Sequence, residues 1–111
     1  MGYIKHNSMI ITVSAAQNGQ LDLVYSKAQK LFGNLVSEII LSPVNGYKTF
    51  FIASSGSKYG WDEYKQHEKC RQELAEFIDS MRFDDNSSFV QFADVSYDED
   101  YEVNVERSNF R

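Results

Sequence analysis

Cysteine, proline and long apolar runs are scarce in this chain of 111 residues, and each scarcity excludes a class of protein. The one cysteine, Cys70, cannot form an internal disulfide and fits a reducing compartment. No apolar run approaches the roughly 20 residues that a membrane-spanning helix requires, and residues 1–8 lack the apolar core of a signal peptide. We therefore expect a soluble cytoplasmic protein that does not bind membranes.

Sequence motifs for catalysis and metal binding are also missing. The chain has no C-x-x-C, H-E-x-x-H or G-x-S-x-G motif, and its Gly-Ser-Lys at 56–58 lacks the spacing of a phosphate-binding P-loop. His67 and Cys70 lie three residues apart, but two ligands do not complete a structural zinc site, and Cys70 fits a buried helix face. We expect a non-enzymatic protein with no cofactor and no metal site.

The chain does contain enough apolar and aromatic sequence for one packed α+β domain over residues 1–111. Apolar residues make up 42% of it, with eight Phe and seven Tyr, which argues against disorder. The length is that of a single domain. Most of the aromatic side chains are expected in a thin two-layer core, and the alternative is an exposed aromatic binding face. Residues 108–111 are expected to fray.

The net charge of −5 is concentrated near the C-terminus. Residues 1–83 carry nine Lys or Arg and eight Asp or Glu, a net of +1, whereas residues 84–106 carry eight acids and no Lys or Arg, a net of −8. Arg107 and Arg111 add +2, which gives −5 in total. Because the acidic segment would repel phosphates, we expect no direct binding of nucleic acid.

Hydrophobic periodicity predicts five strands and two helices. The first helix has an apolar stripe with Asn18 as its N-cap and Gly33 at its C-terminus. The second has a clear apolar stripe only in its C-terminal half, and its polar first turns are expected to project beyond the sheet. The predicted ranges, in chain order, are strand 9–13, helix 19–32, strands 35–41 and 47–53, helix 61–82, and strands 89–97 and 101–106.

This order, β-α-β-β-α-β with a further C-terminal strand, is that of a ferredoxin-like or split βαβ fold. It predicts an antiparallel sheet with both helices on one face. The Asn45-Gly46 turn favours a hairpin between the strands 35–41 and 47–53. Right-handed crossovers would place the strands 9–13 and 47–53 side by side in the middle of the sheet, and we expect this pair to be parallel.

The third predicted strand has two faces with different expected uses. Phe50 and Ile52 are the better core candidates, which places Tyr47, Thr49 and Phe51 on the opposite face. If no element covers that face, its aromatic side chains are a candidate surface for a partner protein. Domains of this fold often associate through such a face or an edge strand, so a homodimer is an alternative by analogy.

Two sequences near this strand carry a resemblance to a known group. SPVNGYKTF at 42–50 and GSKYGW at 56–61, together with Ser87 and Ser88, resemble the pattern S-P-x-N-G-Y-x-(S/T)-F … G-S-K-x-G-W of small uncharacterised proteins encoded by tailed bacteriophages. The resemblance covers residues 3–106. It implies a phage-encoded accessory protein in the host-cell cytoplasm that binds and modulates, for example as an inhibitor, a host or defence protein. It supplies no catalytic residues.

One candidate ligand site follows from the predicted topology. If the strands 9–13 and 47–53 are parallel neighbours, the loops 14–19 and 54–61 meet at one edge of the sheet, each leading into a helix N-terminus that favours anions. The alternative functional hypothesis is therefore a protein that binds a small anionic ligand or a nucleotide, and the structural alternative is a pair of ordinary loops. The candidate ligand-binding residues are Asn18, Ser55, Ser57, Lys58, Tyr59 and Trp61.

The acidic segment is the candidate partner-binding surface. Its one-sided charge favours a host or defence protein with a basic surface. The structural alternative is a charged edge hairpin that discourages strand-to-strand aggregation. The candidate partner-binding residues are Asp94, Asp98, Glu99, Asp100, Glu102 and Glu106.

Overall fold

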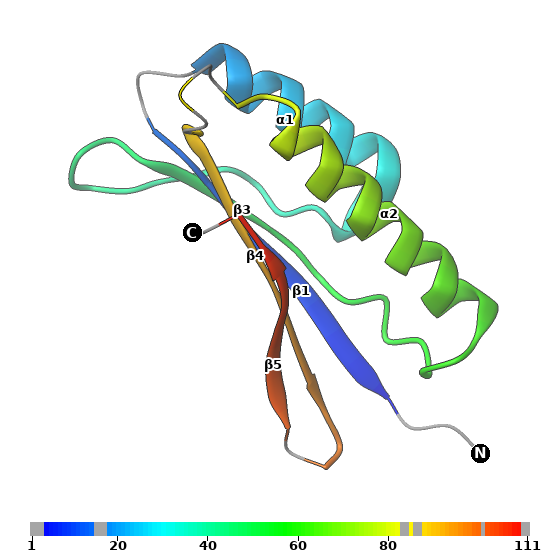
Figure 1. Ribbon diagram of the computed structural model, residues 1–111. Helices are drawn as coiled ribbons and strands as arrows, with labels where there is room; N and C mark the ends of the chain where they lie inside the picture. Colours follow the sequence, from blue (N-terminus) through cyan, green and yellow to red (C-terminus); the bar gives the residue numbers. More distant parts are fainter. Residues whose placement is uncertain (1–3, 15–17, 83–84, 86–87, 101, 110–111) are drawn as a thin grey trace.

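A five-stranded antiparallel sheet forms one layer of the molecule, and two helices on one of its faces form the other (Figure 1). The computed structural model describes residues 4–14, 18–82, 85, 88–100 and 102–109. This α+β architecture is compatible with a ferredoxin-like class, from whose four-stranded β-α-β-β-α-β pattern it differs by a fifth strand. The elements are β1 (Lys5–Val13), α1 (Asn18–Phe32), the short 3-10 helix η2 (Gly33–Leu35), β2 (Ile40–Leu41), β3 (Lys48–Ile52), α2 (Asp62–Asp79), β4 (Val90–Asp98) and β5 (Val103–Ser108).

The strand order is β2-β3-β1-β4-β5, with β1 in the centre. β1 and β3 are neighbours, as predicted, but they are antiparallel: Met9 pairs with Ile52 and Val13 with Lys48. The prediction of a parallel pair is wrong. The β2–β3 hairpin reverses the chain after the α1 crossover, so β3, which lies between β1 and β2, runs opposite to both.

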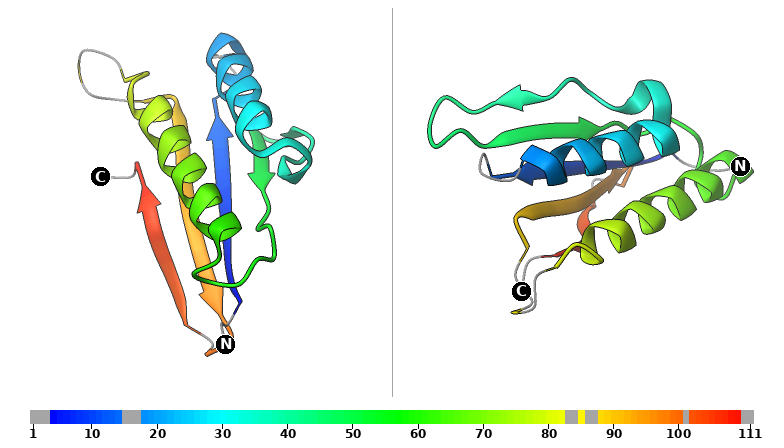
Figure 2. Two further views of the ribbon diagram at one scale, coloured as in Figure 1. Left: turned by 90° about the vertical axis from the view of Figure 1, so that its right-hand side faces the viewer. Right: turned by 90° about the horizontal axis from the view of Figure 1, so that it is seen from above.

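The core lies between the sheet and the helices, which lie side by side on the same face (Figure 2). Alternation along the strands turns one set of apolar side chains toward the helices. The predicted core face of β3 is confirmed, since Phe50 and Ile52 are buried. The buried apolar residues of this core are Met9, Ile11, Val13, Leu21, Val24, Ala28, Phe32, Phe50, Ile52, Leu74, Ala75, Ile78, Val90 and Phe92.

The predicted strand 35–41 is shorter than expected because a bulge interrupts its pairing with β3. Val36 pairs with Ile52 and Ile40 with Thr49, so four steps along one strand match three along the other. At the interruption the hydroxyl of Ser37 accepts a hydrogen bond from the backbone N–H of Phe51 at 2.8 Å. A side-chain oxygen thus replaces a backbone acceptor at the point where the bulge disrupts the ladder.

The turn between β2 and β3 has the predicted geometry. Asn45 and Gly46 both have positive φ angles, 63° and 65°, which a tight hairpin of this kind requires. At the other end of the chain, the expected fraying from residue 108 is wrong for two residues. Ser108 pairs with Ala93, and the Asn109 side chain accepts a hydrogen bond from the backbone N–H of Phe92 at 3.0 Å. Residues 110–111 lie outside the described residues.

Candidate functional site

Polar and charged side chains replace the apolar core beneath the first half of α2. On β1 the inward-facing series changes from Met9 to Asn7, and on β4 it changes from Phe92 to Asp94 and Ser96. These polar residues are as buried as their apolar neighbours. Since burying polar groups is unfavourable unless they are paired, the cluster is the most informative part of the molecule.

Asp94 lies at the centre of this cluster and is 0% exposed. Arg107, opposite it on β5, places Nε 3.1 Å from Asp94 Oδ2, and Arg71 of α2 places Nε 3.9 Å from the same oxygen. Asn7 Nδ2 donates a hydrogen bond to Asp94 Oδ1 at 3.4 Å. Neither arginine is aligned for a hydrogen bond to Oδ2, so among the described residues this buried oxygen and Arg71 Nε have no hydrogen-bond partner. The charges are paired, but the hydrogen bonding around them is incomplete.

The two arginines also bind a second carboxylate, that of Glu68 on α2. Arg107 Nη2 donates a hydrogen bond to Glu68 Oε1, and Arg71 Nη2 donates one to Glu68 Oε2 at 3.4 Å. Tyr64, one turn earlier on α2, donates from its hydroxyl to Asn7 Oδ1 at 2.6 Å, and the Arg71 guanidinium lies 5.3 Å from its ring centre. These contacts fix the first turns of α2 onto the sheet, so the expectation that they project beyond it is wrong.

Burial and hydrogen bonding change the acidity of two carboxyl groups in opposite directions. Burial raises the pKa of Asp94, against the opposing effect of Arg107 and Arg71. Hydrogen bonds from Lys5 and Ser96 lower the pKa of Glu106, on β5 at the edge of the cluster. Asp94 has no exposed surface, so it cannot exchange a proton directly with a ligand.

An open cleft of about 520 Å³ adjoins the cluster. It lies between the N-terminal half of α2, the loop before this helix, Lys5 at the start of β1, and Glu106 of β5. Lys5 Nζ binds Glu106 Oε1 at 2.7 Å in one wall, and Ser96 Oγ donates to the same oxygen at 2.6 Å. The volume is within the range of small-molecule sites. The cleft is lined by Lys5, Tyr59, Gly60, Tyr64, Lys65, Glu68, Lys69 and Glu106.

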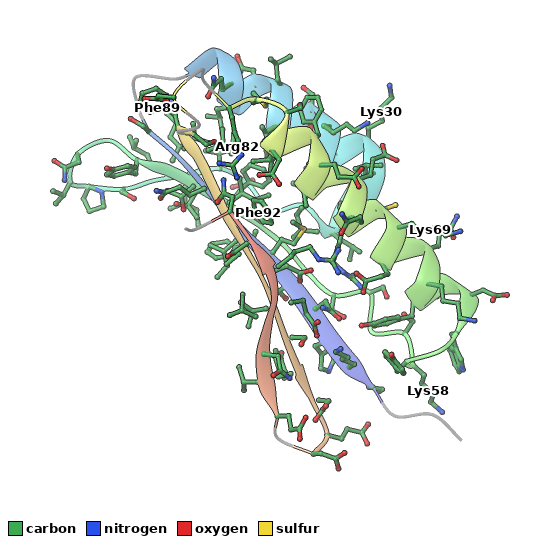
Figure 3. The ribbon with its side chains drawn as sticks, in the orientation of Figure 1. Lys30, Lys58, Lys69, Arg82, Phe89 and Phe92 are labelled. Carbon is green, nitrogen blue, oxygen red and sulfur yellow. The ribbon has the colours of Figure 1, made fainter. Side chains whose placement is uncertain are left out.

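The loop 54–61 and the described ends of the loop 14–19, which were expected to meet, lie at opposite ends of the sheet; residues 15–17 lie outside the described residues. Lys58 bridges to Ile4, just before β1, whereas Ser14, just after β1, bonds to Phe89. Figure 3 shows Lys58 and Phe89 at these two ends. The nine residues of β1 separate them by roughly 30 Å, at ~3.3 Å per residue. The predicted convergent site is wrong because it rested on a parallel β1–β3 pair.

The predicted ligand-binding residues are accordingly divided. Asn18 is the first residue of α1, at the far end from the others, and its side chain lies outside the described residues. Ser55 and Ser57 share a hydrogen bond at 2.7 Å, and Lys58 Nζ lies 5.5 Å from the Trp61 ring centre. Among these candidates it is Tyr59 that lines the cleft.

The predicted partner-binding acids also fall into two groups. Asp94 is fully buried and cannot touch a partner, so that assignment is wrong. Glu106 is held by Lys5 and Ser96 in the wall of the cleft. The rest belong to the tip of the β4–β5 hairpin, where the Asp98 carboxylate accepts a hydrogen bond from the backbone N–H of Asp100 at 2.9 Å. We call Asp98, Glu99, Asp100 and Glu102 the acidic tip.

The sheet face opposite the helices is open, in the part of the chain that the structure describes. Residues that are paired across strands share a face, so the register defines four rows across it. None of the residues in these rows is Asp, Glu, Lys or Arg. The predicted placement of Thr49 and Phe51 on this face is confirmed, and Tyr47 and Phe51 are both exposed. We call this surface the open face; its rows are Ile40-Thr49-Thr12-Gln91, Phe51-Ile10-Ala93-Ser108, Ser8-Val95-Val105 and His6-Tyr97-Val103.

Sequence reasoning missed the buried cluster, although a signal was present. Tyr64 and Arg71 are seven residues apart on α2, two helical turns, and so continue the buried stripe into the polar half of the helix. Asn7, Asp94 and Ser96 occupy inward positions by strand alternation. Arg107 is the first Lys or Arg after the acidic segment 84–106, and it forms an ion pair with Asp94 of that segment. The cluster was missed because each of these polar residues was assumed to be exposed to solvent.

Comparison with known proteins adds no further assignment: no family model, no curated protein and no solved structure matches the chain. Over the residues that the structure covers, no three His, Cys, Asp or Glu side chains are grouped so that they could hold a metal ion. Neither of the described helices has the length and apolarity of a membrane span.

Proposed function

We propose that this protein is a non-enzymatic binding protein whose open face and acidic tip together contact a basic partner protein. The observation that carries the proposal is the direct continuity of the two surfaces. Tyr97 and Val103 form the last row of the open face. Asp98 comes directly after Tyr97 at the end of β4, and Glu102 comes directly before Val103, the first residue of β5. A partner that fits would place an apolar surface on the sheet and basic side chains at the tip.

The open face has the composition of an interface core. Exposed Tyr47, Phe51 and Tyr97 provide aromatic anchors, and no charge would have to be desolvated among the four rows. Interface cores are depleted in charged residues and enriched in aromatic ones. Val103, 70% exposed, and Val105 extend this apolar surface onto the edge strand.

The acidic tip would supply selectivity and speed of association. The tip contains four carboxylates. The two other candidate acids, Asp94 and Glu106, are already neutralised, Asp94 by arginines and Glu106 by Lys5. Electrostatic complementarity of this kind steers a basic partner and disfavours acidic ones. Nucleic acid would be repelled by the same charges.

The wider setting of this proposal rests on the resemblance to phage-encoded proteins. A small domain with an open apolar face would suit an accessory protein that modulates a host or defence protein in the host-cell cytoplasm. We propose further that the domain is a ferredoxin-like unit in which β5 lengthens the sheet and so enlarges the open face. A homodimer formed through that face is the competing assignment.

Capture of a partner from host lysate, repeated with matched variants, tests the proposal. The tip variant Asp100→Lys with Glu102→Lys leaves the Asp98 carboxylate free to hold its turn, and its charge-matched control is Asp22→Lys with Glu38→Lys. We expect the tip variant to lose most of the captured partner at physiological salt and the control to retain it.

The apolar half of the proposal has its own variant. Val103→Ser with Val105→Ser removes exposed apolar surface from β5, and Leu23→Ser, on the exposed side of α1, is the control. We expect the β5 variant to lose the captured partner and the Leu23→Ser control to retain it. Retention of the same partner by both the tip and the β5 variants would contradict the proposal, and a stable dimer that the β5 variant dissociates would assign the face to a second copy.

A further inference from the structure

The cleft beside α2 has its internal charges already balanced. Three cations, Lys5, Arg71 and Arg107, meet three carboxylates, those of Glu68, Asp94 and Glu106, within this part of the molecule. Their sum is zero, since +3 and −3 cancel. Both acids that line the cleft are therefore neutralised by bases next to them, and they oppose an anionic ligand much less than free carboxylates would.

Two further lysines on the same helix give the cleft a net positive charge. Lys65 and Lys69 both line it, and neither has an ion pair with any residue that the structure describes. They are four residues apart on α2, so they lie on one side of the helix within a turn of each other. Adding them to the balanced network leaves a charge of +2 at the cleft in a protein whose net charge is −5.

An aromatic wall stands beside these lysines. The ring of Tyr59 is 49% exposed and lies 5.1 Å from that of Tyr64 in an edge-to-face arrangement, with Lys5 Nζ 5.4 Å from its centre. Tyr64 is buried and held by its hydrogen bond to Asn7. Tyr59 therefore rests on a fixed neighbour and presents surface on which a planar ring can stack.

We propose that this cleft binds a small phosphorylated ring compound, the chemistry of a mononucleotide, with the phosphate between Lys65 and Lys69 and the ring against Tyr59. Lysine ammonium groups bind phosphate as point charges, and the Tyr59 side chain offers a ring on which any planar base can stack. The volume of about 520 Å³ accommodates a single nucleotide. A nucleic-acid chain is disfavoured because the acidic tip lies at the same end of the sheet, where Glu99 accepts a hydrogen bond from the backbone N–H of Ile4.

The buried cluster has a positioning role in this proposal. Arg71 and Arg107 bind both oxygens of Glu68 and so neutralise the carboxylate that lines the cleft beside the phosphate position. Arg71 also lies against the ring of Tyr64, the support of Tyr59. The cost of burying Asp94 is then explained, because this carboxylate holds the two arginines that shape the cleft.

Titration of the isotope-labelled protein with adenosine 5′-monophosphate at low salt, followed by amide NMR shifts, tests the proposal. We expect saturable shifts confined to the loop before α2, to the first turns of α2, and to the strand residues around Lys5 and Glu106 that line the same cleft. Lys65→Ala and Lys69→Ala should each weaken binding roughly tenfold, the loss of one charge-assisted hydrogen bond. The control is Lys30→Ala, which removes an exposed lysine from α1 (Figure 3) and should leave the affinity unchanged.

Adenosine and inorganic phosphate complete the experiment. Both should bind more weakly than the monophosphate, because each makes only half of the contacts. The proposal is overturned if the monophosphate causes no localised shifts, if the Lys65→Ala and Lys69→Ala variants bind like Lys30→Ala, or if either fragment alone binds as tightly as the whole. The spectra of the variants report directly whether they are folded, and none of these outcomes depends on the open face.

Discussion

The layer between the helices and the sheet has two halves of opposite chemistry. In the half under α1, the inward side chains are apolar, with Val13, Phe50 and Val90 fully or almost fully buried. In the half under the start of α2, the same strands bury Asn7 and Asp94 instead. The change occurs within single strands, so it reflects a choice at each inward position and not a difference between separate parts of the fold.

The two halves differ in how much they contribute to the stability of the fold. Each apolar side chain contributes about 1.5–3 kcal/mol through burial, and the apolar half needs no precise partner geometry. The polar half contributes little net stability, because desolvation offsets the attraction between buried charges. A cluster that stabilises so little, in a layer that apolar residues could fill, suits the construction of the adjoining cleft.

The largest expected effect breaks the apolar half. Phe50→Ala should reduce the free energy of unfolding by about 4 kcal/mol, because it removes a fully buried ring that packs edge-to-face on Tyr25. Phe51→Ala is the matched control, one residue along β3 on the open face, and should cost about 1 kcal/mol or less. Urea denaturation measures both, and equal losses would mean that the two faces of β3 are not chemically distinct.

A smaller effect is expected from breaking one charge in the polar half. Arg107→Met should cost about 3 kcal/mol, because it leaves Asp94 with Arg71 as its remaining cation at 3.9 Å and removes a donor from Glu68. In an Asp94→Asn background the same substitution should cost clearly less, since the buried negative charge is already gone. Additive losses in this double-mutant cycle would contradict the arrangement, and they would show that Arg107 acts through packing alone.

The pH dependence sharpens the contrast within the polar half. Since burial raises the pKa of Asp94, the folded state holds that proton more tightly than the unfolded state, and stability falls as pH rises from 3.8, its ordinary value, through the folded value. Hydrogen bonds lower the pKa of Glu106, so its contribution is present above 4.5, its ordinary value, and is lost as pH falls through the folded value. The two effects partly cancel in the native chain.

Single substitutions separate these two effects. Asp94→Asn should remove the decline above pH 3.8, and Glu106→Gln should remove the acid loss below pH 4.5. Thermal unfolding across this range measures both slopes. A decline above pH 3.8 that is unchanged in Asp94→Asn would contradict the raised pKa of the buried carboxyl.

The sequence carries a strong signal for the apolar half of this layer and only a partial signal for the polar half. Periodicity identified both helices, and alternation placed Phe50 and Ile52 in the core, because burial of apolar residues repeats at fixed spacing. For a polar residue the signal is weaker. Strand alternation places Asp94 on the inward side, but its burial can be predicted only when Arg107 is known to lie opposite it. That pairing depends on the register of β4 and β5, which a pattern within one strand does not specify.

The direction of one strand had the largest consequence for the candidate site. The prediction that β1 and β3 are neighbours is confirmed, but the prediction that they are parallel is wrong. As a result, the loop 54–61 lies at the start of β1 and not at its end, where the loop 14–19 begins. Of the predicted ligand-binding residues, Tyr59 lines the cleft beside α2, although the site was predicted from a different arrangement. Tyr59 lines this cleft with α2 and β1, a contact that follows from the packing of Tyr64 on Asn7.

The smallest expected effect comes from a charge pair outside both halves. Lys27 Nζ lies 2.7 Å from Glu73 Oε2 between the two helices, where both side chains are partly exposed to solvent. Lys27→Met should cost about 0.5 kcal/mol or less, because water competes for both charges, and added salt should narrow the difference from the native chain further. Urea denaturation at two salt concentrations measures this. A loss as large as that of Arg107→Met would contradict the comparison, since burial would then not determine what a charge pair is worth in this fold.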